Sequence, residues 1–138
     1  MSDAPESART QDLSFSVTLS AEPAFAETAG ALAARAGDFA GCPADDARRL
    51  GEAVREAFAR LAATATAAQR LQLVVQGSPR LVRIDLCCDA AEAGAGLEAR
   101  LEGPDSAEPI QSLVDRVEFG TAHDAAFCRF TQQVRPTR

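Results

Sequence analysis

The chain has 138 residues, of which 46% are hydrophobic and 25% charged, and this length suits a single domain. All fourteen positive side chains are arginines, so mechanisms that need a P-loop lysine or a Schiff-base lysine are excluded. The formal net charge of -6 disfavours nonspecific binding to DNA or RNA, and we expect no nucleic-acid partner.

The first element is predicted to be a strand that follows a polar tail. Residues 1–11 are small, polar and without periodicity, and they lack the apolar region of a signal peptide. From Leu13 to Ser20, apolar and hydroxyl side chains alternate, as in a half-buried strand.

No run in the sequence approaches the roughly eighteen consecutive apolar residues of a membrane span. We therefore expect a cytoplasmic protein with no membrane partner.

Two amphipathic helices are predicted next. Pro23 suits the first turn of the first helix, which Gly41 and Pro43 end. The second helix begins near Ala44, and its first turn carries two aspartates, which the helix dipole favours. Apolar residues recur in each helix at spacings of three and four. They are Phe25, Ala29, Leu32, Ala36 and Phe39 in the first helix, and Leu50, Val54, Ala57 and Leu61 in the second.

The second half of the chain is predicted to contain strands and a third helix. The runs 71–75 and 81–88 are joined by a turn-rich link of the length that a β-hairpin uses. A short alternating run at 97–101 allows another strand. A short helix is predicted after Ser106, because apolar residues then recur at helical spacing. These residues are Ile110, Leu113, Val114 and Val117, and they are followed by an extended segment at 117–119 and a last strand at 126–134.

This order of elements predicts a two-layer α/β sandwich. Strand pairs outnumber helices, which favours a mixed, mostly antiparallel sheet with all three helices on one face. We expect one domain over residues 12–134, between the tail at 1–11 and a fraying C-terminus at 135–138.

The cysteines and the single histidine, His123, do not suggest a metal site. Cys42, Cys87, Cys88 and Cys128 include no C-x-x-C pair. Cys87 and Cys88 are adjacent in a predicted strand, so their side chains point to opposite faces. We expect small apolar fillers and neither a metal nor a redox pair.

Three segments together resemble a known family. They are Phe15–Pro23, with the sequence FSVTLSAEP, Leu50–Phe58, with LGEAVREAF, and Ile110–Phe119, with IQSLVDRVEF. Their order and spacing are similar to the GHKL-type ATPase domain of bacterial anti-sigma factors and serine-protein kinases, over roughly residues 12–134. The resemblance implies a histidine-kinase-like ATPase fold, ATP and Mg²⁺ as cofactors, a sigma factor or an anti-sigma antagonist as partner, and dimerisation.

The resemblance also implies a catalytic glutamate on the second helix, with a Mg²⁺-binding asparagine four residues later. The sequence allows two registers, Glu52 followed by Glu56 or Glu56 followed by Arg60. At about 100° per residue, Glu52 lies nearly opposite the apolar stripe and Glu56 on its flank, so we prefer Glu56. The asparagine is missing in both registers. Arg60 would repel Mg²⁺, and a plain surface ion pair with Glu56 is the alternative interpretation.

The other nucleotide motifs of the family are altered. Glu92, Gly94 and Gly96 have the spacing of its Asp-x-Gly-x-Gly adenine motif, with glutamate in place of aspartate. They are the candidate nucleotide-binding residues, and a flexible turn is the alternative. Where the family has a glycine-rich lid, residues 103–109 contain two prolines and two carboxylates, which disfavour a triphosphate.

These observations favour an anti-sigma-like regulatory protein that binds protein partners, with a degenerate nucleotide site and no bound cofactor. An alternative is an active ATP-dependent serine-protein kinase that uses Glu56 with ATP and Mg²⁺. A third is an α/β interaction module that dimerises through its alanine-rich helices.

Overall fold

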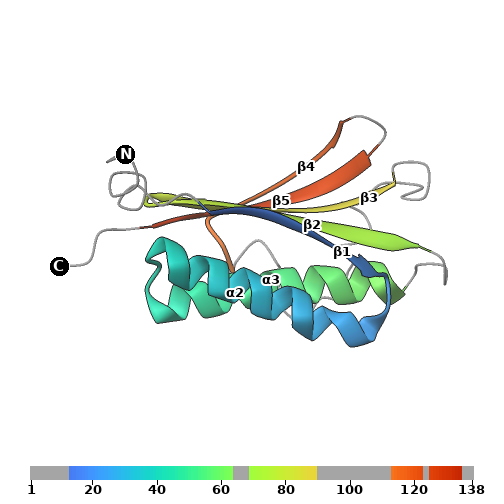
Figure 1. The fold of residues 1–138 in the computed structure, drawn as a ribbon, viewed down its shortest axis with the longest axis horizontal. Helices are drawn as coiled ribbons and strands as arrows, with labels where there is room; N and C mark the ends of the chain where they lie inside the picture. Colours follow the sequence, from blue (N-terminus) through green and yellow to red (C-terminus); the bar gives the residue numbers. More distant parts are fainter. Residues whose placement is uncertain (1–12, 64–68, 90–112, 123–124, 135–138) are drawn as a thin grey trace, which may run out of the picture.

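The computed structural model describes residues 13–63, 69–89, 113–122 and 125–134. In these ranges, two α-helices cover one face of a five-stranded sheet (Figure 1). The two-layer α/β sandwich expected from the sequence is therefore confirmed. Its elements are β1 (Leu13–Ser20), the 3₁₀ turn η1 (Pro23–Phe25), α2 (Ala26–Ala40), α3 (Ala44–Ala63), β2 (Arg70–Ser78), β3 (Leu81–Asp89), β4 (Arg116–Ala122) and β5 (Ala125–Gln133).

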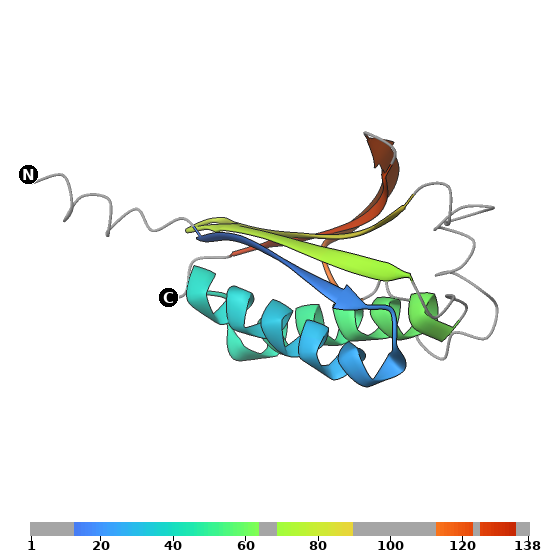
Figure 2. The same cartoon turned by 45° about the vertical axis from the view of Figure 1, so that its right-hand side comes forward.

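The strands lie in the order β1-β2-β3-β5-β4, and every pairing among them is antiparallel. Among the described strands, β1 and β4 therefore lie at the edges of the sheet. Figure 2 shows β5 bending away from the helices at one end of the sheet. The helices leave the opposite face of the sheet uncovered by any described element (Figures 1 and 2).

The described residues contain two α-helices where three were expected. Leu113–Asp115 form a turn, and Val117 lies in β4, opposite Phe130. The turn is tied to the end of β5, because the Asp115 N–H donates to Gln132 Oε1 over 3.2 Å. The helix prediction is thus wrong from Leu113 onward, since a few apolar residues at helical spacing also fit a turn followed by a strand. The rest of that helix, and the possible strand at 97–101, lie outside the described residues.

The hairpin of β2 and β3 has a tighter turn than the sequence suggested. Gln76, Gly77 and Ser78 belong to β2, and only Pro79 and Arg80 form the turn. Gly77 lies in the sheet beside β1, where an added Cβ would lie 3.6 Å from Leu13 Cβ. Glycine is common in turns, but the place of Gly77 in the sheet depends on the neighbouring strand.

The core lies between the helices and the sheet and is filled by apolar side chains from both layers. Each of the following is at most 2% exposed. They are Leu50, Val54, Phe58 and Leu61 of α3, with Leu71, Leu73, Val75, Val82, Ile84, Leu86 and Phe130 of the sheet. Burial of this surface is the main favourable contribution to folding.

Small residues allow α2 and α3 to pack closely against each other. A Cβ added to Gly30 would lie 2.8 Å from the carbonyl oxygen of Gly51, and the reverse distance is also 2.8 Å. Nearby, a Cβ on Gly37 would lie 3.1 Å from Ala47 Cβ. The contact between α2 and α3 within one chain thus explains part of the alanine and glycine content of these helices. None of the helices in the described part is long and apolar enough to span a membrane.

Candidate functional site

The predicted catalytic residue, Glu56, lies on α3 and forms an ion pair with Arg60. Arg60 Nε donates to Glu56 Oε2 over 3.0 Å, and the side chains are 17% and 38% exposed respectively. The pairing across one helical turn that the sequence allowed is therefore present. Because Mg²⁺ prefers oxygen ligands, a guanidinium at the position of the expected asparagine does not fit a magnesium site.

Glu52, the alternative candidate, is in a similar environment. It accepts a hydrogen bond from Arg48 Nη1 over 3.1 Å, and its side chain is 42% exposed. The side chains of Glu52 and Glu56 are thus 42% and 38% exposed, which is a small difference. The structure encloses neither side chain. Each glutamate has an arginine partner one turn away, four residues before Glu52 and four residues after Glu56.

The other predicted nucleotide-binding residues lie outside the described residues. They are Glu92, Gly94 and Gly96. The altered lid at 103–109 and His123 also lie outside. Within the described ranges, no group of three His, Cys, Asp or Glu side chains is placed to hold a metal ion.

The uncovered face of the sheet carries rows of mostly polar side chains that the strand register aligns. Residues directly opposite each other in antiparallel strands point to the same face. The pairings of all five strands define three such rows. The rows are Ser14, Gln76, Arg83, Thr131 and Arg116; Ser16, Val74, Asp85, Arg129 and Glu118; and Thr18, Gln72, Cys87, Phe127 and Gly120.

A charged cluster lies in the middle of this face. Arg129 Nε and Nη2 donate to the two carboxylate oxygens of Asp85 over 2.8 and 3.1 Å. The guanidinium carbon lies 4.8 Å from the centre of the Phe127 ring, within the range of a cation–π contact. The hydrogen bond to Asp85 raises the pKa of Arg129. Such a bidentate, partly buried pair fixes both side chains in position.

Cys87 lies beside this cluster and is a poor nucleophile. Burial, and then the charge of Asp85, raise the pKa of the Cys87 thiol from 9.0 to about 11. The thiolate is the reactive form of cysteine, so this thiol is largely protonated at neutral pH. All four cysteines are free thiols, and Cys42, Cys88 and Cys128 are buried.

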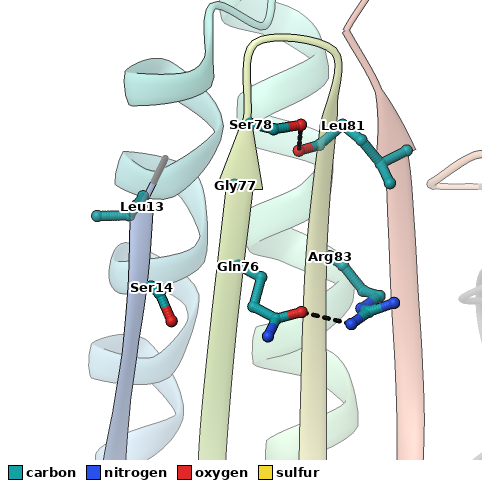
Figure 3. Close-up of a pocket in the computed structure, with 7 residues that line it drawn as sticks. All are labelled: Leu13, Ser14, Gln76, Gly77, Ser78, Leu81 and Arg83. Carbon is teal, nitrogen blue, oxygen red and sulfur yellow. Dashed lines mark hydrogen bonds between the residues drawn. The ribbon is translucent and has the colours of Figure 1, made fainter. Parts of the chain in front are cut away.

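An open pocket of about 380 Å³ lies on the same face, at the hairpin end of β1, β2 and β3 (Figure 3). Its polar lining comprises Ser14, Gln76, Ser78 and Arg83, with Leu13 and Leu81 among its apolar residues. Arg83 donates to the side-chain oxygen of Gln76, and this contact holds the guanidinium across two strands (Figure 3). These lining groups can donate and accept hydrogen bonds, but they include no carboxylate, thiol or imidazole. The pocket is therefore suited to binding a ligand through hydrogen bonds.

The sequence could predict only part of this surface. Because side chains alternate along a strand, the sequence of 81–88 alone indicates that Arg83 and Asp85 share one face. Arg129 lies 44 positions from Asp85, and only the pairing of β3 with β5 brings the two together. No signal along the chain indicated that pairing.

Comparison with known proteins adds no family assignment. No protein-family model matches the chain, and no curated protein matches it. The likeness to anti-sigma factors and serine-protein kinases is thus carried by the three segments of the sequence alone.

Proposed function

We propose that this chain is a regulatory domain that binds a sigma factor or an anti-sigma antagonist, and that it has lost phosphotransfer activity. The observation that carries the proposal is the ion pair between Glu56 and Arg60. The Arg60 guanidinium donates to Glu56 Oε2 over 3.0 Å, so one oxygen of the proposed base is already engaged by a positive charge. That guanidinium also stands where catalysis in the family needs a ligand for Mg²⁺.

The packing below this pair supports the same proposal. On the sheet side of α3, Val54, Ala57, Phe58 and Leu61 are at most 1% exposed. Side chains thus fill the space between α3 and the sheet, and a nucleotide could not enter there without displacing core residues.

The uncovered sheet face is the surface that we assign to the partner. It combines the pocket, the polar rows and the bidentate pair of Asp85 and Arg129. Mixed polar and charged surfaces of this kind suit reversible protein contacts, where charge complementarity supplies specificity.

Calorimetric titration with Mg·ATP tests the loss of the nucleotide site. We expect no saturable heat up to about 500 μM nucleotide, which corresponds to binding weaker than roughly 4–5 kcal/mol. A dissociation constant below about 100 μM, or transfer of labelled phosphate to a serine of a partner protein, would instead support the kinase alternative. The Glu56→Gln variant is the control for transfer, since it keeps the helix and removes the carboxylate.

Binding to purified sigma factors and anti-sigma antagonists tests the regulatory role. We expect one of them to bind in the micromolar range or tighter, and Arg83→Ala on the uncovered face to weaken that binding at least tenfold. The matched control is Arg35→Ala, which removes an exposed arginine from α2 on the other layer. If no member of either class binds, the regulatory proposal fails. If Arg83→Ala and Arg35→Ala weakened partner binding equally, the uncovered face would not be the partner surface.

A further inference from the structure

Arginines gather at the hairpin end of the uncovered sheet face, although the chain has a net charge of -6. Of the three rows on this face, the one nearest the turn of β2 and β3 contains Arg83 and Arg116 and no carboxylate. Arg80 lies exposed in the turn itself. The next row contains Asp85 and Glu118, and each of them already has an arginine partner. In the described part of the chain, Arg80 and Arg83 form no ion pair, so this end of the face is locally positive.

Arg83 is held in place without losing its charge. Its guanidinium donates to the side-chain oxygen of Gln76 on the neighbouring strand, and Figure 3 shows the two side chains pointing toward each other. The amide of glutamine is neutral, so this hydrogen bond orients the guanidinium and leaves its charge uncompensated. A guanidinium has several N–H groups, and most of them remain available to a ligand. Because Arg83 is half-buried, a hydrogen bond to an anion is stronger here than in open water.

The pocket beside Arg83 also offers hydroxyl groups and an apolar border. Ser14 and Ser78 line it together with Leu13 and Leu81. Leu81 is 37% exposed, which is unusual for a large apolar side chain in this protein. It is two residues from Arg83 on the same strand, so both point to the same side of the sheet, about 7 Å apart. A ligand that fits this pocket thus has an anionic group for Arg83 and an apolar group next to it.

We propose that this pocket binds a carboxylate side chain from an acidic linear segment of the partner protein. The carboxylate accepts two hydrogen bonds from the Arg83 guanidinium, and an aliphatic residue beside it covers Leu81. Arg80 and Arg116 attract further carboxylates of the same segment. The inference rests on the proposed assignment of the uncovered face to the partner, and it adds the chemistry that this partner must have.

The surrounding charges favour a protein segment over a nucleic acid. Asp85 and Glu118 lie in the row next to Arg83 and Arg116. A continuous chain of phosphates along the arginine row would run beside both carboxylates and be repelled by them. A protein segment can place its carboxylates opposite the arginines and neutral side chains elsewhere. The exposed Leu81 likewise has a complement in an aliphatic side chain and none in a phosphate backbone.

A labelled acidic peptide tests the proposed chemistry. Fluorescence anisotropy compares the peptide SELESELESS with its neutral match SQLQSQLQSS, in which glutamine replaces each glutamate. At low salt we expect the acidic peptide to bind with a dissociation constant of about 300 μM or tighter. The glutamine peptide should bind at least about tenfold more weakly, because it offers no charge to Arg83. Weaker binding of the acidic peptide, or equal binding of the two peptides, would overturn the proposal.

Substitution of Arg83 locates the binding. Arg83→Gln removes the charge but keeps a polar side chain beside Gln76, and it should weaken binding of the acidic peptide about tenfold. The matched control is Arg35→Gln, which removes the same charge from the exposed side of α2 and should change the affinity by less than about twofold. Circular dichroism establishes that both variants are folded. Equal effects of the two substitutions would refute Arg83 as the binding residue.

Amide resonances of the ¹⁵N-labelled protein map the contact independently of any substitution. On addition of the acidic peptide, the largest changes should lie in residues 13–16, 74–78 and 81–85, which surround the pocket. Changes confined to α2 and α3 would overturn the proposed site.

A labelled single-stranded DNA of similar length tests the competing class of anion. We expect it to bind more weakly than the acidic peptide, because its phosphates meet Asp85 and Glu118. Tighter binding of the DNA, lost in Arg83→Gln, would replace the proposed protein segment by a nucleic acid.

These outcomes are separable from those of the regulatory proposal. If a sigma factor or an anti-sigma antagonist binds and the acidic peptide does not, the acidic-segment chemistry is wrong and the regulatory role stands. If the peptide binds through Arg83 and neither class of protein does, the regulatory role fails and the acidic-segment site stands.

Discussion

Arg129 binds both carboxylate oxygens of Asp85 across the pairing of β3 with β5, over 2.8 and 3.1 Å. The two residues lie directly opposite each other in the sheet, and their side chains are 28% and 16% exposed. Because both are partly removed from water, either partner left alone would retain a poorly solvated charge. The pair therefore connects the C-terminal hairpin to the middle of the sheet.

Replacement of Arg129 by alanine should lower the free energy of unfolding by about 1–3 kcal/mol, because Asp85 would lose both hydrogen bonds while remaining partly buried. Arg129→Lys should lower the free energy of unfolding by less than Arg129→Ala. A lysine keeps the positive charge, but it cannot bind both carboxylate oxygens in the same way. Urea denaturation measures both changes.

The control for that prediction is Arg116→Ala, which removes the arginine of an exposed pair with Glu118. Exposed pairs contribute little, so we expect a loss of about 0.5 kcal/mol or less. Equal losses in Arg116→Ala and Arg129→Ala would contradict the special role of the Asp85 pair.

Gly30→Ala should destabilise the contact of α2 with α3. The added Cβ would lie 2.8 Å from the Gly51 carbonyl oxygen, a backbone atom that can move only if a helix shifts. We expect a net loss of about 1–3 kcal/mol, even though alanine favours a helix by about 1 kcal/mol over glycine. Gly37→Ala provides the comparison, because its Cβ would lie 3.1 Å from Ala47 Cβ and should cost less. Thermal denaturation of both variants should rank Gly30→Ala as the less stable protein.

Gly41→Ala should also destabilise the protein, but through backbone strain. Gly41 ends α2 with a φ of 99°, a conformation that residues with a Cβ rarely adopt. The nearest atom to an added Cβ, in Val134, is 3.7 Å away, so crowding is absent. We expect a loss of about 1 kcal/mol for alanine and a smaller one for asparagine, which tolerates this region better. An alanine variant as stable as the asparagine variant in urea would rule out strain as the cause.

Cys87 should react slowly with thiol reagents in the folded protein. Its pKa is raised to about 11, so at pH 8 the thiolate fraction is small and should rise about tenfold per pH unit. The rate of reaction with Ellman's reagent, compared with the rate in urea, measures this protection. A Cys87→Ala variant identifies which fraction of the signal belongs to this thiol. A rate in the folded protein equal to that in urea would contradict the assigned environment.

The same raised pKa predicts a loss of stability in alkali. Between pH 9 and 11 the unfolded thiol ionises while the folded thiol keeps its proton, so the free energy of unfolding falls as the pH rises. Below pH 9 both forms are protonated, and this contribution to stability is complete. The decline between pH 9 and 11 should be smaller in Cys87→Ala, as urea denaturation at each pH would show. An identical decline in both proteins would mean that other groups cause it.

The sequence predicted those helices and strands whose own residues carry a periodic or capping pattern. The alternation of Leu13–Ser20 predicted β1, and Ala44 begins α3 as the acidic first turn indicated. The pairing of Glu56 with Arg60 could also be anticipated, because helix geometry alone places residues four apart side by side. In contrast, the spacing around Leu113 indicated a helix where the chain forms a turn and then β4. Too few residues contribute there for periodicity to separate the two structures.

The order of the predicted elements determined the two-layer class. The apolar face of α3 and the local charge pairs also followed from the sequence, because they depend on residues within a few positions of each other. The predicted apolar face of the first helix was wrong at Phe39, which is 50% exposed. Only the tertiary structure decided that β3 lies between β2 and β5, which brings Asp85 to Arg129. It also decided that Gly30 meets Gly51 and that β1 lies at an edge of the five described strands. These features depend on contacts between distant segments, and strand order and register follow from the packing of the whole sheet.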